Sequence, residues 1–234
     1  MIEHVYRRAA AAPSVGAVVV ATDDARIAQA VEAFGGIAWL TRPDHRSGSD
    51  RLAEVAASLT SPIVINVQGD EPLIQPAMIE QAVAPLVEDD SLVMSTLRRR
   101  LTDAAEWADP NVVKVVVDRE GFALYFSRFA VPYLRERGTG AVSRQEGVGF
   151  PPVPPWSADW GPWKHIGLYV YRRDFLLRFA ALEPAPLETA ESLEQLRALE
   201  HGYRIKTVET REDSIGVDTP ADLDKVRRLL AAEV

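Results

Sequence analysis

The distribution of apolar and polar residues in the first half of the chain predicts strands and helices in alternation. Short apolar runs predict strands at residues 17–21, 37–40, 63–67 and 92–97, and helical periodicity predicts helices at residues 24–34, 49–59 and 76–87. Asp23 or Asp24 can cap the first of these helices, and Gly35-Gly36 ends it. This order is typical of an α/β fold with a mixed, mostly parallel sheet.

The second half departs from this order. Apolar runs at residues 112–117 and 122–126 flank Asp118-Arg119-Glu120-Gly121, which predicts an antiparallel hairpin. We expect further strands at residues 166–171 and 205–208, and a helix at residues 187–201. Thr219, Pro220 and Asp222 match the start of a last helix with a capping box. Because no repeat or low-complexity tract interrupts the chain, we expect one domain over residues 1–234.

Residues 138–163 form the least regular segment. They contain glycines and five prolines together with Trp156, Trp160 and Trp163. We expect an ordered loop or lid, because three tryptophans are more apolar surface than a disordered linker usually carries. Disorder is the alternative.

Composition excludes several classes of site. The 234 residues are 47% hydrophobic, which is enough to bury a full core. The chain has no cysteine, which excludes disulfides, thiolate metal sites and a cysteine nucleophile. The net charge of −8 argues against broad nucleic-acid binding, although a small anion can still bind. Without a run of about 18 apolar residues or an amino-terminal signal, we expect a cytoplasmic protein with no membrane insertion.

The most informative motif is Asn66-Val67-Gln68-Gly69-Asp70-Glu71-Pro72, which directly follows a short apolar run. In an open parallel sheet, ligands bind beyond the carboxyl ends of the strands. A carboxylate there can hold a hard cation against a phosphate, so the motif indicates a site for a metal and a nucleotide. The alternative is that Asp70 and Glu71 only begin a turn that leads into the helix opened by Pro76.

A second carboxylate occupies a similar place in Gly216-Val217-Asp218-Thr219-Pro220, between a predicted strand and a helix start. Two such acids from distant parts of the chain can share divalent ions, which orient the attacking and leaving oxygens in a displacement at phosphorus. The alternative reading makes Asp218 a residue that complements the helix dipole.

Three further segments carry candidate binding groups. Residues 42–51 form a polar loop that opens onto a helix, where free N–H groups and hydroxyls can hold a base or an anion, although Ser49 can also be an ordinary cap. In the strand 165–171, His165, Gly167, Tyr169 and Tyr171 share one face, which forms either a pocket or a structural aromatic cluster. The run Arg98-Arg99-Arg100 is either a basic pocket or a solvated edge.

The order of these segments resembles the 3-deoxy-manno-octulosonate cytidylyltransferases, also called CMP-Kdo synthetases, over residues 2–229. The matching segments are R-P-D-H-R-S-G-S-D-R, I-N-V-Q-G-D-E-P, P-N-V-V-K-V-V, A-L-Y-F-S-R, H-I-G-L-Y-V-Y, P-L-E-T-A-E-S-L-E-Q-L-R and G-V-D-T-P. Each segment is weak alone, and seven in one order make a specific match.

The resemblance implies a Rossmann-like nucleotide-diphospho-sugar transferase fold and a Mg²⁺-dependent reaction. In this reaction the anomeric hydroxyl of 3-deoxy-manno-octulosonate (Kdo) attacks the α-phosphate of CTP and releases pyrophosphate, for lipopolysaccharide biosynthesis. A homodimer with CTP and Kdo as small-molecule substrates is also implied. No enzyme nucleophile is required, so positioning and charge neutralisation would carry the catalysis.

Positions within the motifs imply the roles of individual residues. The catalytic and metal-binding residues would be Asp70 and Asp218, and the nucleotide would be bound by Ser47, Gly48, Ser49 and Arg51. The sugar acid would be bound by Gln68, Arg128, His165, Tyr169, Glu188, Glu191 and Gln195. Arginine and histidine can bind a carboxylate, and Glu and Gln can bind sugar hydroxyls.

The beginning of the chain departs from the family, which starts with a strand and a loop of the type A-R-x-x-S-x-R-x-P-G-K-x-L that grips the triphosphate. Here Met1-Ile2-Glu3-His4-Val5 resembles the sequence just after that loop. We therefore expect the chain to lack this interior strand and the phosphate-binding loop, with unmade ladder bonds worth about 1 kcal/mol each. The hypothesis is that Met1 is an internal methionine taken as the start.

Two rival functions follow from the sequence. The first is a different transferase of the same fold, either a nucleotidylyltransferase for another sugar acid or a glycosyltransferase. The single D-x-D, Asp222-Leu223-Asp224, lies inside a predicted helix rather than at a strand end, which argues against a glycosyltransferase. The second is a catalytically impaired, truncated homologue that binds sugar acid or pairs with a full-length subunit.

Overall fold

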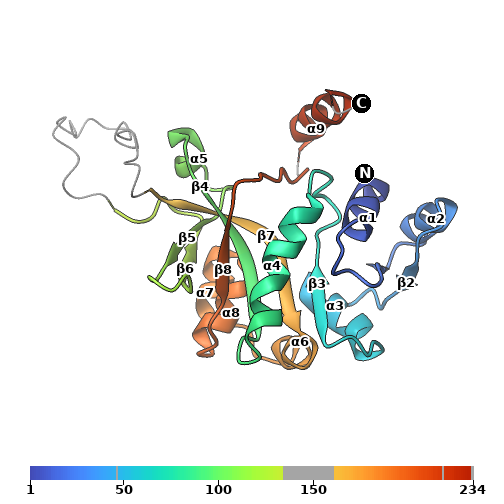
Figure 1. The fold of residues 1–234 in the computed structure, drawn as a ribbon, viewed down its shortest axis with the longest axis horizontal. Coiled ribbons are helices and arrows are strands. Elements are labelled where there is room, and N and C mark those ends of the chain that lie inside the picture. Colours follow the sequence, from blue (N-terminus) through green and yellow to red (C-terminus); the bar gives the residue numbers. More distant parts are fainter. Residues whose placement is uncertain (46, 134–160, 218, 233–234) are drawn as a thin grey trace.

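The computed structural model describes residues 1–45, 47–133, 161–217 and 219–232 (Figure 1). Its strands form two sheets. The smaller sheet pairs β1 (Val20–Thr22) in parallel with β2 (Ala38–Leu40), and α2 (Ala25–Ala33) connects them. As predicted, Asp24 caps α2 by accepting a hydrogen bond from the Arg26 N–H at 2.8 Å.

The larger sheet has the order β6-β5-β7-β4-β8, and β3 pairs with β7 as well. Its strands are β3 (Ile63–Asn66), β4 (Met94–Arg100), β5 (Lys114–Val117), β6 (Ala123–Ser127), β7 (Trp163–Arg172) and β8 (Lys206–Thr210). In the described part of the chain, no pairing joins β1 to β3, so the two sheets are separate.

The predicted α/β architecture with a mixed sheet is confirmed, but the expected majority of parallel pairings is wrong. Only β1 with β2 and β4 with β8 pair in parallel among the described strands, whereas β3, β4 and β5 each pair antiparallel to β7, and β5 to β6. The reason is topological. The returning strand β7 inserts between β3 and β4, which run in the same direction and would otherwise pair in parallel.

The long central strand β7 divides the core into two clusters. Ile166, Leu168 and Val170 face α4 (Pro76–Glu88) in one cluster, and Tyr169 and Tyr171 pack in the other. The second cluster contains side chains of α3 (Gly48–Ala57), α6 (Arg173–Ala180) and α8 (Gln195–Glu200). The alternation predicted for residues 165–171 is therefore confirmed.

The two ends of the larger sheet meet beside the hairpin. Phe122 forms an antiparallel bridge with Lys206, and the Thr207 N–H donates to the Gly121 carbonyl at 2.8 Å. Gly121 has φ +81°, and a Cβ there would lie 3.2 Å from both Arg98 Nη1 and the Thr207 carbonyl. Glycine is therefore required here both by conformation and by space.

Several helices differ from expectation. The predicted helix 187–201 is two helices, α7 (Pro186–Glu191) and α8, because Ser192 has φ 53° and interrupts the hydrogen-bond series. The helices that the sequence reading did not identify are α1 (Ile2–Ala10), α5 (Ala104–Ala108) and α6. The capping box is confirmed at α9 (Pro220–Ala232), where the Asp222 N–H donates to Thr219 Oγ1 at 3.2 Å and Asp222 Oδ2 accepts from the Thr219 N–H at 2.9 Å.

The predicted loop 138–163 is corrected at its end. Trp163 is the first residue of β7, and the guanidinium groups of Arg98 and Arg100 lie 4.8 and 4.7 Å from its ring centroid. Residues 138–160 lie outside the described residues. Arg99 pairs with Asp213 at 3.3 Å, so within the described residues each arginine of the run contacts another side chain, although Arg98 Nε and Arg100 Nη1 are buried without a hydrogen-bond partner there.

Candidate functional site

The turn after β3 places Asp70 beside the segment that leads into α9. The Glu71 N–H donates to the Gln68 carbonyl at 3.2 Å, which closes the turn, and Gln68 itself is exposed. The Val217 N–H donates to the Asp70 carbonyl at 2.9 Å. Asp218 lies outside the described residues, but its neighbour in sequence is thus hydrogen-bonded to Asp70.

Glu71 is a site residue to which the sequence reading assigned no role. Its Oε1 lies 3.1 Å from the position that a Cβ on Gly167 would take, so its side chain packs over β7, and a larger residue at position 167 would displace this flexible carboxyl by a few tenths of an ångström. Burial raises the pKa of the Glu71 carboxyl, the charge of Asp70 raises it further, and Lys164 opposes the rise. The sequence carried a signal for this, because Asp70 and Glu71 are adjacent, and two adjacent carboxyl groups cannot both be buried and both keep their ordinary pKa.

On β7, His165 and Tyr169 form an aromatic row with Phe126 of β6. The ring centroids of His165 lie 5.1 Å from Phe126 and 5.2 Å from Tyr169. Burial lowers the pKa of His165 to about 3, so its imidazole is neutral at physiological pH. The Tyr169 hydroxyl is buried and makes no hydrogen bond to the described residues, and burial raises its pKa well above the ordinary value. Such an orphaned buried hydroxyl requires an explanation, and a ligand group is one.

Arg128 and Glu191 lock the end of β6 to the end of α7. The Glu191 carboxylate accepts hydrogen bonds from Ser127 Oγ at 2.7 Å, the Arg128 N–H at 2.9 Å and the Tyr125 hydroxyl at 3.2 Å. Burial alone would raise the pKa of this carboxyl, but these hydrogen bonds lower it below its usual value. The Arg128 guanidinium donates to the carbonyls of Glu191 and Ser192 at 2.8 and 3.4 Å, where α7 ends.

Glu188 has a structural partner of its own. Its carboxylate is hydrogen-bonded and ion-paired to Arg197, and the two side chains are only 11% and 7% exposed. It also accepts from the Ala185 N–H at 3.1 Å at the start of α7. Burial would raise its pKa, but the Arg197 contact holds it below the usual value. Glu188 therefore fixes α7 against α8, and the buried side chain of Gln195 begins α8 beside this pair.

The predicted nucleotide residues gather at the start of α3. Ser47 is the cap, with Oγ accepting from the Asp50 N–H at 3.2 Å, and Gly48 is exposed with open space where a Cβ would stand. Ser49 points inward and is 4% exposed. Arg51 donates to Thr41 Oγ1 and pairs with Asp23 at 3.2 Å. Arg51 thus ties α3 to the ends of β1 and β2, and the exposed residue of the first turn is Gly48.

Lys114 is a second residue that sequence reasoning missed. It has no exposed surface, and its ammonium donates to the carbonyls of Asp109, Val112 and Arg128 at 2.8, 2.5 and 2.7 Å. Burial lowers its pKa to about 8. The signal was a lysine within an apolar strand, which predicts a buried ammonium with carbonyl partners.

Among the described residues, two cavities of about 450 Å³ border opposite parts of α6 and of the segment that follows it. One is lined at its α3 side by Ser47, which was predicted to bind the nucleotide, and at its α7 side by Glu188, which was predicted to bind the sugar acid. It therefore brings one residue of each predicted set to the same cavity.

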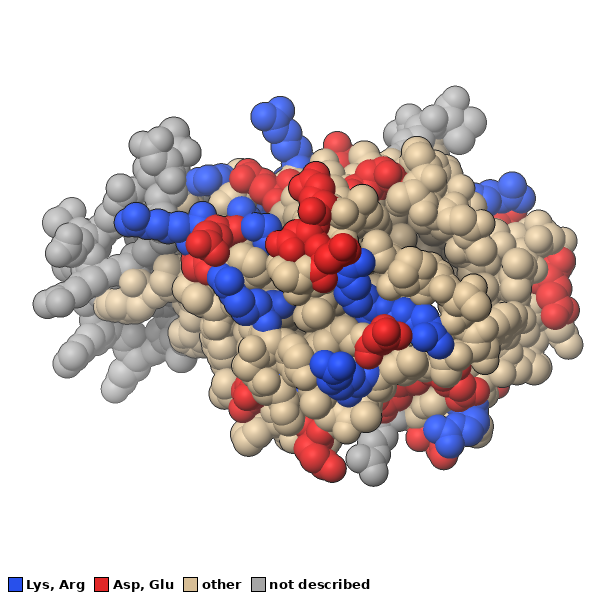
Figure 2. All heavy atoms as spheres, turned by 60° about the horizontal axis from the view of Figure 1, so that its bottom comes forward, with Lys and Arg blue, Asp and Glu red and all other residues tan. Residues whose placement is uncertain are grey.

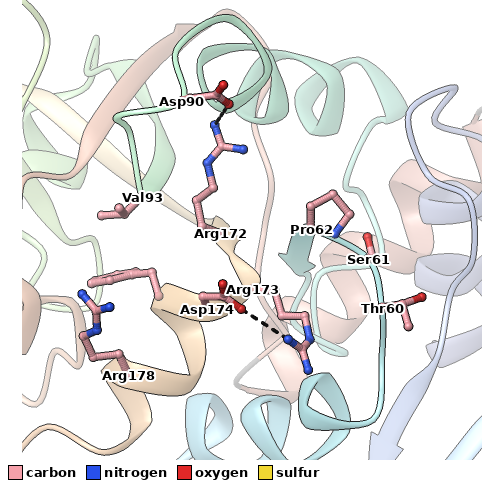
Figure 3. Close-up of a pocket in the computed structure, with 10 residues that line it drawn as sticks. Thr60, Ser61, Pro62, Asp90, Val93, Arg172, Arg173, Asp174 and Arg178 are labelled. Atoms are coloured by element: carbon pink, nitrogen blue, oxygen red, sulfur yellow. Dashed lines mark hydrogen bonds and ion pairs between the residues drawn. The ribbon is translucent and has the colours of Figure 1, made fainter.

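The other cavity lies where β3 and β4 begin and β7 ends (Figure 3). Two of its three lining arginines, Arg172 and Arg173, are held by contacts within the protein. Arg172 donates to the Leu86 carbonyl at 2.6 Å at the end of α4, and Arg173 to the Ala56 carbonyl at 2.8 Å at the end of α3. They also pair with Asp90 and Asp174. Figure 2 shows basic side chains beside acidic ones across this face. Arg172 and Arg173 thus compensate the dipoles of α4 and α3, which leaves Arg178 as the third cation of this cavity.

The described residues contain no group of three His, Asp or Glu side chains arranged to hold a metal ion. The predicted ligand pair cannot be judged from them because Asp218 lies outside. Among the described helices, none has the length and apolar character needed to cross a bilayer.

Comparison with known proteins identifies the family. The cytidylyltransferase family model matches residues 1–207. The 3-deoxy-manno-octulosonate cytidylyltransferase of Geobacter metallireducens is 55% identical over 226 residues, which cover 97% of this chain and 85% of that protein. The protein of the same name from Solibacter usitatus is 49% identical over 234 residues, 100% of this chain and 85% of that protein.

A solved structure supports the same assignment. The structure of CMP:2-keto-3-deoxy-manno-octonic acid synthetase complexed with CTP matches with a TM-score of 0.86 at 44% identity and covers 100% of this chain and 88% of that one. The predicted loss of an amino-terminal strand and loop stays a prediction. The extent and identity of these matches show that this chain belongs to the 3-deoxy-manno-octulosonate cytidylyltransferase family.

Proposed function

We propose that this protein transfers CMP from CTP to the anomeric hydroxyl of Kdo. In this reaction the hydroxyl oxygen bonds to the α-phosphorus of CTP and loses its proton. The bond from that phosphorus to the oxygen that bridges to the β-phosphate breaks, and pyrophosphate leaves. The observation that carries the proposal is the 55% identity to a 3-deoxy-manno-octulosonate cytidylyltransferase over 97% of the chain. The solved relative with CTP bound supports CTP as the nucleotide.

The geometry supports a division of the site into two binding regions. The first turn of α3, with Ser47 as its cap and Gly48 exposed, offers N–H groups to the nucleotide. The face of β7 with His165 and Tyr169, closed by the Arg128–Glu191 lock and the start of α8, would hold the sugar acid. Gln68 and Asp70 would lie between the two regions.

Mg²⁺ is the cofactor that we propose, with Asp70 and Asp218 as its protein ligands. The residues fit a hard cation in type, since carboxylate oxygens are the ligands Mg²⁺ prefers, and Val217 is hydrogen-bonded to Asp70. When bound, the metal would neutralise phosphate charge and help to orient the reacting groups. The chain's own contribution is to hold the two substrates in line and to exclude water from between them.

A homodimer is part of the proposal, and exposed apolar side chains on and after β6 are compatible with it. Leu124, at the start of β6, is 60% exposed, and Phe129 and Tyr133, beyond its end, are 66% and 88% exposed. Exposed apolar side chains are typical of interfaces. Sedimentation of the protein beside a Leu124→Lys variant tests this; a monomer at micromolar concentration would contradict it. A cytoplasmic location also stays a prediction.

Pyrophosphate release from CTP, Mg²⁺ and Kdo tests the function. We expect turnover that requires all three components. Asp70→Asn should lower kcat by a factor of about 100 or more, since an ionic interaction with the transferring group is lost. Asp90→Asn, at the cavity beyond the opposite ends of the strands, is the matched control and should retain activity.

Two other outcomes would contradict the proposal. Turnover with a different sugar acid and none with Kdo would assign another nucleotidylyltransferase. Heat of Kdo binding in calorimetry, without pyrophosphate when CTP and Mg²⁺ are added, would indicate a binder without catalysis.

A further inference from the structure

A bulge in the central strand lies beside the proposed sugar-acid site. In the pairing of β4 with β7, Thr96 lies opposite Tyr169 and Leu97 opposite Ile166. Gly167 and Leu168 of β7 therefore face no residue of β4. Bulges of this kind leave backbone groups outside the ladder and redirect nearby side chains.

The Thr96 hydroxyl occupies this interruption. Thr96 is fully buried, and its Oγ1 lies 2.8 Å from the Leu168 carbonyl, 3.1 Å from the Ile166 carbonyl and 3.0 Å from His165 Nε2. A hydroxyl has one proton to donate and lone pairs to accept with. Carbonyl oxygens can only accept, so the proton must be directed to them, with Leu168 as the nearer acceptor.

The direction of the Thr96 hydroxyl proton determines the tautomer of His165. If the hydroxyl proton were directed to Nε2 instead, the Thr96 oxygen would face two carbonyl oxygens at contact distance with no proton between them, in a buried place where unmade hydrogen bonds are costly. Nε2 must therefore carry the proton and donate to Thr96 Oγ1. A neutral imidazole protonated at Nε2 has an acceptor at Nδ1.

The surroundings of His165 agree with a neutral ring. Phe126 and Tyr169 contact it, and burial lowers its pKa to about 3. Its backbone is fixed by donation from the His165 N–H to the Val113 carbonyl at 2.8 Å. In the described part of the chain no hydrogen bond engages Nδ1, and the residue keeps an intermediate exposure, so this nitrogen remains available to a ligand.

We propose that Thr96 is a positioning residue that fixes His165 in the Nε2–H tautomer, so that Nδ1 accepts a hydrogen bond from a hydroxyl of the sugar acid. This assignment differs from the expectation that His165 binds the carboxylate of the sugar acid. The identity of the ligand rests on the proposed function, whereas the tautomer of the free protein does not.

Long-range proton–nitrogen NMR correlation of ¹⁵N-histidine protein tests the tautomer directly. The chain has four histidines, and His165→Gln identifies the signals of this one. At pH 7 we expect a pyrrole-type Nε2 and a pyridine-type Nδ1. A His165 ring protonated at Nδ1, or at both nitrogens, would overturn the proposal.

Two substitutions of Thr96 separate its hydroxyl from its packing. Thr96→Ser keeps the hydroxyl and should keep the Nε2–H tautomer even if it lowers stability. Thr96→Val removes the acceptor at nearly constant volume, and the ring should shift toward the Nδ1–H form or a mixture. An unchanged tautomer in folded Thr96→Val, with circular dichroism as the fold check, would show that Thr96 does not fix it.

Kinetics of the same variants test the role of Nδ1. Thr96→Val should raise KM for Kdo by about tenfold, the value of one hydrogen bond, with KM for CTP within twofold, and Thr96→Ser should restore it. If the tautomer shifts and KM for Kdo is unchanged, the proposed contact between His165 Nδ1 and a hydroxyl of the sugar acid is refuted, and the role of Thr96 in fixing the tautomer is not. If the protein shows no turnover with any nucleotide, the proposed function fails while the NMR result still decides the tautomer, and calorimetric Kd values for Kdo replace KM.

Discussion

Replacement of Lys114 by methionine is expected to destabilise the protein by about 3 kcal/mol. Methionine has a similar length and no donor, so the part-buried carbonyls of Asp109, Val112 and Arg128 each lose the hydrogen bond that Lys114 now provides. Each hydrogen bond contributes roughly 1 kcal/mol net to the free energy of unfolding. A hydrogen bond from a charged donor can contribute more, but removal of the buried charge offsets part of that excess. The free energy of unfolding from urea titration measures the change.

The matched control is Lys206→Met. Lys206 donates to a single carbonyl, that of Glu120, near the surface. Its replacement should cost less than about 1 kcal/mol. If Lys114→Met were no more destabilising than this control, the three contacts would not hold the segment from Asp109 to the end of β6, and the reasoning would be refuted.

Three further predictions concern the interior of the site. Glu188→Gln should lower the free energy of unfolding by about 3 kcal/mol because it leaves Arg197 buried without its charged partner. In a double-mutant cycle measured by urea unfolding, Glu188→Gln combined with Arg197→Met should cost less than the sum of the two single changes. Additive costs would contradict this prediction. The pKa of His165 is about 3 in the folded protein, which is below its unfolded value. Between about pH 6.5 and 3 the unfolded chain therefore binds a proton that the folded protein does not, so the free energy of unfolding decreases as the pH is lowered through this window. Between pH 7.5 and 5 the wild type should lose roughly 1 to 2 kcal/mol more than His165→Gln; equal losses would show that the folded ring titrates normally. Gly167→Ala should lower kcat about tenfold and leave the thermal midpoint almost unchanged, because its Cβ would stand 3.1 Å from Glu71 Oε1 and displace that flexible carboxyl. Gly16→Ala, with open space around its Cβ, should change neither kcat nor the thermal midpoint.

Local patterns predicted those elements that depend on local chemistry. The cap at Asp24, the capping box at Thr219 and the hairpin around Gly121 were readable because each depends on residues within four positions of one another. The position of β7 between β3 and β4 was not readable, because it is decided by pairing between strands far apart in sequence. The break at Ser192 escaped for a similar reason, since Arg128 satisfies the carbonyls at the end of α7 from another strand.

The candidate site was predictable where a motif carried its chemistry. Asp70, His165 and Glu191 were selected by residue type and place, and their roles stay predictions. Thr96 gave no signal, because a threonine in a strand is ordinary until a bulge brings carbonyls and an imidazole around its hydroxyl. Ser49 shows the opposite case, a polar residue in a binding motif whose side chain is buried.

The place of β8 in the larger sheet has a consequence for biosynthesis. β8 pairs with β4, with Lys206 opposite Ser95, so β8 leaves the ribosome long after β4 and only when most of these 234 residues have been made. Pairing over such a distance in sequence forms slowly. Until then β4 has an unpaired edge, which is a template for association with other chains. Nascent chains that stop before residue 206 are therefore expected to aggregate, and the yield of folded protein should depend on how quickly the last strand arrives.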